Sequence, residues 1–133
     1  MLFRSPATLA VRWSTKWKRW DGLKYTNAFA DNFAESESEL RYVPLYSRDG
    51  GQTWLNMRDD TQAQPGELPR NAAGAADPAR TLSDMTPSGN ETYVWATPAA
   101  DFPQGVYVLR IEAYRASQPL HYAQHQEKIH VDR

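Results

Sequence analysis

Apolar and polar residues alternate most regularly over residues 106–115. Alternation with a period of two residues is typical of a β-strand whose two faces meet different surroundings. It predicts one strand here, with apolar residues on one face and a mixture of apolar and polar residues on the other. The first set is Tyr107, Leu109, Ile111 and Ala113, and the second is Val106, Val108, Arg110, Glu112 and Tyr114.

The same period predicts further strands along the chain. They cover residues 8–14, 40–46, 53–57, 91–96 and 126–131, with a short extra strand near 24–28. In these strands the large residues share a face as Leu9, Val11 and Trp13, as Tyr42 and Tyr46, as Tyr93 and Trp95, and as Ile129 and Val131. No segment keeps a helical period of 3.6 residues. The pattern therefore predicts an all-β chain.

Pro44 interrupts the second of these strands. Proline has no backbone N–H and cannot donate to a sheet ladder. We therefore expect either that residues 40–46 form an edge strand, or that the nitrogen of Pro44 faces away from a neighbouring strand.

Two long connections separate the predicted strands. Residues 15–39 are aromatic at first and acidic at the end, whereas residues 58–90 consist mostly of Pro, Gly, Ala, Asp and Thr. A loop of the second kind is uncommon in a compact domain and is either a functional excursion or a mobile insertion. Because residues 71–76 offer little to pack or bind, the sequence favours a mobile insertion within one domain over residues 1–133.

A turn motif joins the strands 40–46 and 53–57. Asp and two Gly residues between two strands predict a tight hairpin in which Asp49 accepts backbone N–H groups. The spacing Ser-x-Asp-x-Gly-x-Thr-Trp resembles the Asp-box, a hairpin motif of sialidases and other secreted sugar-handling proteins, on Ser47, Asp49, Gly51, Thr53 and Trp54. In that family the motif is structural, so the resemblance implies architecture and context and no reaction. A sialidase-type propeller needs several similar blades, and this chain has one box and no internal repeat.

Three fragments together resemble an immunoglobulin-like sandwich of the fibronectin type III style. Residues 9–13 are similar to its second strand, residues 40–57 to its third strand and hairpin partner, and residues 102–113 to its sixth strand. Residues 128–132 then supply the closing strand. The resemblance implies an antiparallel β-sandwich. The chain departs from it in its long connections and in lacking a clear first strand, unless residues 2–5 provide one.

Composition excludes several classes of partner. The 133 residues carry 15 Lys and Arg against 16 Asp and Glu, and the net charge of −1 provides no field that would attract nucleic acid or an anionic membrane. No window is apolar and long enough to insert into a membrane. The absence of cysteine excludes disulfides and thiolate metal sites, while the aromatic content is sufficient to build a core without a cofactor.

Candidate catalytic and metal-binding groups are sparse. His121 and His125 would share a face only on a helix, and the alternation around His130 favours surface histidines on a strand. Acidic residues occur at Asp31, Glu35, Glu37, Glu39, Asp59 and Asp60, but they do not follow a calcium-loop spacing. No nucleophile elbow is present. We expect no enzyme activity, no metal and no cofactor.

The sequence leaves three functions open. The first is a non-catalytic immunoglobulin-like module, a spacer or interaction domain of a larger exported bacterial protein that is periplasmic, cell-surface or extracellular. Its partners would be other domains of that protein, another protein or a glycan. The second is a carbohydrate-binding module in which exposed rings stack on sugars, using Trp17, Trp20 and Tyr25. The third is a fragment of a glycoside hydrolase. Aromatic residues among Lys16, Lys18, Arg19 and Lys24 also suit single-stranded nucleic acid, although the overall charge argues against it.

Overall fold

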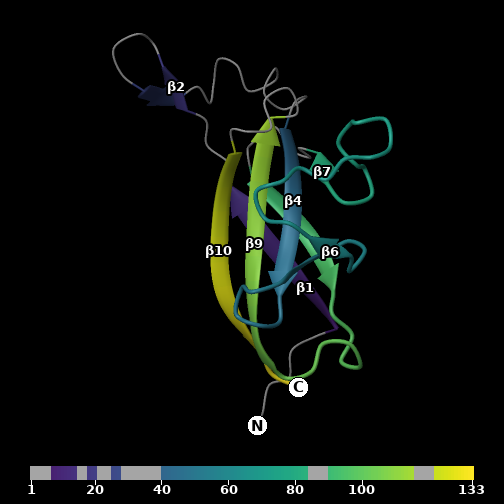
Figure 1. Cartoon of the computed structure of the whole chain (residues 1–133). Coiled ribbons are helices and arrows are strands. Elements are labelled where there is room, and N and C mark those ends of the chain that lie inside the picture. Colours follow the sequence, from purple (N-terminus) through teal and green to yellow (C-terminus); the bar gives the residue numbers. More distant parts are fainter. Residues whose placement is uncertain (1–6, 15–17, 21–24, 28–39, 84–89, 116–121) are drawn as a thin grey trace.

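The computed structural model describes residues 7–14, 18–20, 25–27, 40–83, 90–115 and 122–133. All ten regular elements in these ranges are β-strands (Figure 1). In the same ranges there is no helix of the length and hydropathy that crossing a membrane requires. The prediction of an all-β chain with antiparallel sheets is confirmed.

The larger sheet is built around β4 (Leu40–Ser47) and β9 (Gly105–Arg115), which pair antiparallel along the whole of β4. On the far side of β9 lies β10 (Tyr122–Val131), a strand that begins four residues earlier than the sequence predicts. On the other side of β4, two short strands pair with different parts of it. There β5 (Trp54–Asn56) is followed by β6 (Gln62–Ala63), and β7 (Leu82–Ser83) pairs with the start of β4.

A second sheet consists of β1 (Thr8–Ser14) and β8 (Asn90–Ala96), which pair antiparallel. In Figure 1, β1 crosses the larger sheet obliquely, and residues of both sheets share the same apolar clusters. Two antiparallel sheets packed in this way are compatible with a β-sandwich. A separate ladder joins β2 (Lys18–Trp20) to β3 (Tyr25–Asn27), the short strand expected near residues 24–28.

Aromatic rings fill the space between the two sheets. Tyr46 of β4 lies 4.9 Å from Trp95 of β8 and 5.4 Å from Phe102, measured between ring centroids. Trp95 and Phe102 meet edge to face at 5.1 Å. The faces predicted from alternation are confirmed, because the inward sets of β1, β4, β8, β9 and β10 are those found in these clusters.

Pro44 does not lie on an edge strand, since β4 has neighbours on both sides. Its carbonyl accepts a hydrogen bond of 2.8 Å from the backbone N–H of Met57, on the side of β5. In an antiparallel strand the nitrogen and carbonyl of one residue point the same way. The nitrogen of Pro44 therefore faces the interval where β5 has ended and β7 has not begun. The edge alternative is wrong, and the other alternative describes the strand: Pro44 faces away from its continuous neighbour β9.

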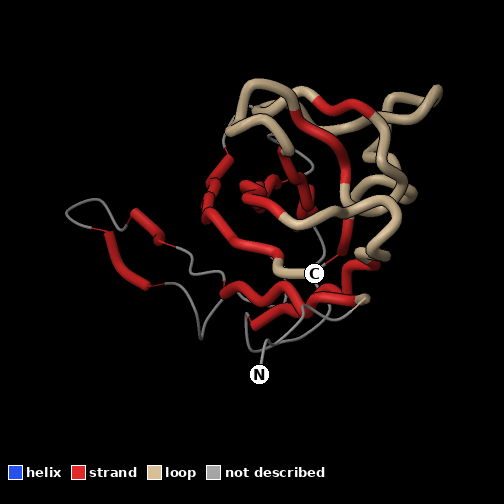
Figure 2. The backbone as a smooth tube through the Cα atoms, turned by 90° about the horizontal axis from the view of Figure 1, so that it is seen from below, coloured by secondary structure: helices blue, strands red, loops and turns tan. Residues whose placement is uncertain are grey.

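The segment that follows β5 covers the outer face of the larger sheet. Leu68 is only 8% exposed and packs in one cluster with Val43, Leu45 and Tyr114. In Figure 2 most of the loops, drawn in tan, lie together on one side of the strands. Residues 71–75, in the stretch expected to offer little to pack, are exposed. The packing of the remaining segment through one buried leucine and the partly buried Ala63 and Ala76 was not predicted.

Replacing Leu68 by Ala should lower the free energy of unfolding by about 2–4 kcal/mol, because the truncation leaves a cavity beneath the segment. Urea denaturation measures the change. Val94→Ala removes apolar atoms from a side chain that is 61% exposed and should cost less than about 0.5 kcal/mol. Equal, small effects of the two variants would show that residues 58–83 are not packed as described.

Candidate functional site

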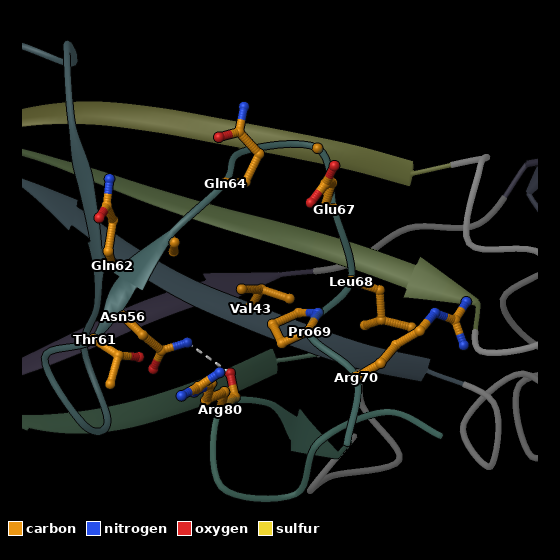
Figure 3. A pocket seen from close by; sticks show the side chains of 12 residues that line it. Val43, Asn56, Thr61, Gln62, Gln64, Glu67, Leu68, Pro69, Arg70 and Arg80 are labelled. Carbon is orange, nitrogen blue, oxygen red and sulfur yellow. Dashed lines mark hydrogen bonds between the residues drawn. The ribbon is translucent and has the colours of Figure 1, made fainter. Parts of the chain in front are cut away.

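A polar pocket of about 550 Å³ opens on the outer face of the larger sheet, beneath residues 58–83. Val43 of β4, Asn56 of β5 and the two residues of β6 come from the sheet, and the other lining residues come from the rest of the segment that follows β5 (Figure 3). The lining consists of Val43, Asn56, Thr61, Gln62, Ala63, Gln64, Gly66, Glu67, Leu68, Pro69, Arg70 and Arg80.

Asn56 joins the sheet to the covering segment at the base of the pocket. Its side chain is fully buried, and its amide nitrogen donates to the carbonyl of Arg80 at 2.8 Å. Its amide oxygen accepts the backbone N–H of Arg58 at 2.9 Å. The backbone N–H of Asn56 also donates to the carbonyl of Thr61. A short polar side chain thereby closes the turn after β5 and fixes the position of a residue 24 places further along.

Arginine side chains brace the rest of the segment. Arg80 donates from Nε to the carboxylate of Asp59 at 2.9 Å. Burial opposes the ionisation of Asp59, but the hydrogen bonds from Thr61 and Arg80 outweigh it and lower the pKa of this carboxyl. Arg58 donates to the carbonyls of Pro78 and Thr81, each at 2.6 Å. These contacts pair two guanidinium groups with loop carbonyls and a carboxylate, and they hold the segment next to the pocket in place.

A buried carboxylate ties the covering segment to β9. Glu112 is fully buried and accepts from Nε of Arg110 at 2.7 Å, from the hydroxyl of Tyr114 at 2.8 Å and from the backbone N–H of Gly66 at 2.8 Å. Burial and the hydrogen bond to this carboxylate raise the pKa of Tyr114. Gly66 has φ of 83°, and a Cβ there would come within 3.0 Å of the hydroxyl of Tyr122. The site therefore requires glycine at position 66.

The open side of the pocket presents hydrogen-bonding groups of both neutral and charged side chains. Gln62 and Gln64 are exposed, and Figure 3 shows them with Glu67 along one side of the pocket, while Thr61 and Arg80 lie toward the other. Glu67 is the only carboxylate among the described residues that line it. Glutamine amides both donate and accept hydrogen bonds, so this surface suits a polar ligand. It does not bring two carboxylates together.

The hairpin between β4 and β5 forms a hydrogen-bonded turn. Asp49 accepts the backbone N–H groups of Gln52 at 3.1 Å and Thr53 at 2.9 Å, and also the hydroxyl of Thr53. The hydroxyl of Ser47 accepts the backbone N–H of Gly51, whose φ is 98°. Hydrogen bonds from the side chains of Thr53 and Ser47 hold the pKa of Asp49 well below its usual range. Trp54 enters the outer cluster beside Leu68. The five residues of the motif therefore form one turn: Ser47, Asp49, Gly51, Thr53 and Trp54. In the sequence they are well separated from the aromatic residues proposed to bind sugars.

Those aromatic residues are described only in part. Trp17 lies outside the described residues. Trp20 and Tyr25 lie at directly opposite positions in the β2–β3 ladder, and the structure gives only their backbone. The sequence alone did not predict this pairing, although the short distance between the two residues along the chain is compatible with a hairpin.

The remaining candidates from the sequence are dispersed. His125 lies on a strand and contacts Glu127 at 2.9 Å, so the helical arrangement with His121, which lies outside the described residues, does not apply to it. His130 is exposed on the face opposite Ile129 and Val131, as alternation predicts. Asp60 accepts the hydroxyl of Tyr46 at 2.6 Å, and burial together with this bond raises the pKa of Tyr46 to about 12. Within the described ranges, no group of three His, Cys, Asp or Glu residues is arranged to hold a metal ion.

Sequence reasoning missed the pocket and the Glu112 network. A signal was present, because Arg110 and Glu112 occupy one face of a strand on which Val108 and Tyr114 are buried. Comparison with known proteins adds no further assignment: no protein family, curated protein or solved structure matches this chain.

Replacing Asp49 by Asn should make stability less dependent on acid pH. A carboxyl whose pKa is lowered on folding stabilises the protein above its unfolded pKa of about 3.9, and that contribution is lost as pH falls toward the folded pKa. Unfolding free energies from about pH 5 to about pH 2 should therefore fall more steeply for the wild type than for Asp49→Asn. Asp101→Asn, at an exposed position elsewhere in the fold, controls for loss of one carboxylate. If the free energy of unfolding changed with pH in the same way for wild type and Asp49→Asn, the lowered pKa of Asp49 would be contradicted.

Replacing Glu112 by Gln should destabilise the protein by about 2–4 kcal/mol, because the amide keeps the shape but leaves Arg110 without its buried counter-charge. Its NH₂ group also meets a donor where the carboxylate accepted one. Urea denaturation measures the loss. The matched control is Glu127→Gln on the neighbouring strand, where the side chain is exposed and the change should stay within about 0.5 kcal/mol. If the free energies of unfolding of the two variants differed by less than about 0.5 kcal/mol, the network would not be a stabilising element.

Proposed function

We propose that this chain is a non-catalytic immunoglobulin-like module, an interaction domain of a larger exported bacterial protein. The observation that carries the proposal is the polar pocket on its outer face, which is built by a long segment held in place by many hydrogen bonds. Long ordered loops on a rigid scaffold are a common place for binding functions.

The strand pairing supports the immunoglobulin-like assignment. One sheet has the order β10-β9-β4-β5, and the other is the pair β1-β8. The immunoglobulin-like fold has this arrangement if β1 and β4 are its second and third strands and β8, β9 and β10 are its fifth, sixth and seventh. The hydroxyl of Tyr107, near the start of β9, also donates to the carbonyl of Pro103 at 2.6 Å. This contact resembles the tyrosine corner found at the start of the sixth strand.

The chemistry of the pocket supports binding in preference to catalysis. The exposed amides of Gln62 and Gln64 suit hydrogen bonds to a polar segment of a partner, such as the backbone of a peptide or the hydroxyl groups of a glycan. Glycoside hydrolysis uses a pair of carboxylates, whereas Glu67 is alone among the described lining residues. We infer that the partner is a protein segment, in keeping with a module that contacts neighbouring domains.

A carbohydrate-binding module is the second candidate. It is favoured by the register of the β2–β3 ladder, which places Trp20 directly opposite Tyr25. Directly opposite residues in an antiparallel pair lie on one face, the arrangement from which an aromatic platform for a sugar would be built.

Peptides displayed on phage and selected on the chain test the first candidate. Binding should weaken roughly tenfold in a Gln62→Ala, Gln64→Ala double variant, which removes two hydrogen-bonding side chains. Gln104→Ala alters an exposed glutamine away from the pocket and should leave affinity unchanged. Peptides that bind all three proteins equally would place the interaction elsewhere on the surface.

The same chain titrated with oligosaccharides of several linkages, and followed by NMR, tests the second candidate. Trp20→Ala should abolish any sugar-induced shifts if the hairpin binds glycans. Release of shortened sugars during the titration would contradict the assignment of a non-catalytic module.

A further inference from the structure

The edge of the larger sheet formed by β10 is unusually open. β10 pairs with β9 over ten consecutive residues without a bulge, and on its other side it has no partner among the described residues. Residues 122–128 are exposed, with Tyr122 at 42%. Sheet edges are normally shortened, bulged, interrupted by proline or lined with charged side chains to prevent pairing with another strand. β10 carries the charged residues Glu127 and Lys128 but is long, unbulged and free of proline, so a strand that pairs with it must accommodate these charges, whereas β6 at the opposite edge has only two residues.

The two faces of β10 carry different residues. Ile129 and Val131 point into the sandwich, so His125 and Glu127 lie on the same inner face, where they contact each other at 2.9 Å. They line a cavity of about 320 Å³ together with Arg12 and Trp13. Gln124, Gln126 and Lys128 lie on the outer face. Both glutamines accept from Nη1 of Arg110, Gln126 at 2.6 Å and Gln124 at 3.5 Å.

We propose that β10 pairs antiparallel with β10 of a second copy of this chain, about a two-fold axis through Gln126. In this register His125 of each copy lies opposite Glu127 of the other, and Gln124 lies opposite Lys128. An imidazole N–H can donate to the carboxylate opposite it, and favourable cross-strand pairs of this kind stabilise antiparallel pairing. Two-fold symmetry makes the contact self-complementary, so each favourable pair occurs twice.

Complementary side chains favour this register over its neighbours. In an antiparallel pair, two opposite residues either both direct their N–H and C=O groups toward the partner strand or both direct them away. The two-fold axis must therefore pass through a residue and not between two residues. An axis through His125, Glu127 or Lys128 places that residue against its own copy. The axis through Gln126 brings a glutamine against a glutamine, which can exchange amide hydrogen bonds. Among the described residues of β10, it alone places His125 opposite Glu127.

The size of the contact predicts weak association. A single strand edge buries less surface than the roughly 1,200–2,000 Å² typical of stable complexes. The dimer should therefore form in a concentration-dependent way, with a dissociation constant on the order of 100 µM. The contact is separate from the polar pocket, so its failure would leave the proposed function intact.

Single cysteines in this cysteine-free chain test the register. Two copies of residue 126 would lie roughly 5 Å apart between Cα atoms, whereas two copies of residue 130 would lie roughly 27 Å apart. Under mild oxidation Gln126→Cys should form disulfide-linked dimers at least about tenfold faster than His130→Cys. Equal rates, or faster linkage at position 130, would overturn the register. Gln52→Cys, exposed in the turn between β4 and β5 and separated from β10 by β9, gives the rate for random collisions.

Charge exchange tests the pairing without cysteines. Glu127→Lys should weaken dimerisation roughly tenfold in sedimentation velocity, since it places an ammonium group opposite a histidine in both symmetric pairs. His125→Glu should weaken it similarly. The double variant His125→Glu, Glu127→Lys restores opposite charges and should recover the wild-type association. A wild-type chain that stays monomeric up to about 1 mM would overturn the proposal and leave the edge for a strand of another protein.

Discussion

The buried carboxylate of Glu112 determines how the outer face of this molecule is organised. It accepts hydrogen bonds from a guanidinium, a phenol and a backbone N–H. Taking a carboxylate out of water is costly, and the cost is offset only when such partners surround it. The partner contributed by Gly66 comes from the covering segment, so burial of Glu112 and docking of that segment depend on each other. The polar pocket exists because this segment is held above the sheet.

The inner face follows a simpler constraint. Alternation in β1, β4, β8 and β9 directs aromatic and aliphatic side chains into one layer, where they are buried. Burial of such surface is the main favourable contribution to folding. This contribution is additive over residues and needs no particular partner. It is therefore readable from the order of residues along each strand, and the faces of Leu9, Tyr46, Trp95 and Tyr107 could be predicted from the sequence.

The outer face could not be predicted in the same way. Residues 58–83 contain few large apolar residues, and their order depends on contacts such as Asn56 with Arg80 and Gly66 with Glu112. These pairs are separated by 24 and 46 positions. No periodicity marks a hydrogen bond between distant residues, so the polar contacts that hold this segment on the sheet could not be predicted from composition. Pro44 illustrates the same limit: its missing donor was evident, but the division of one strand edge between β5 and β7 was not.

The Glu112 network also links the two surfaces to which we assign interactions. Arg110 donates from Nε to Glu112 and from Nη1 to Gln126, so one guanidinium spans the distance from the covering segment to β10. Because a guanidinium is planar and rigid, fixing one of its nitrogens restricts the directions of the others. The carboxylate that anchors Gly66 thus also orients the group that holds Gln126 at the exposed edge. The pocket and the edge of the sheet share a structural origin, although they would bind different partners.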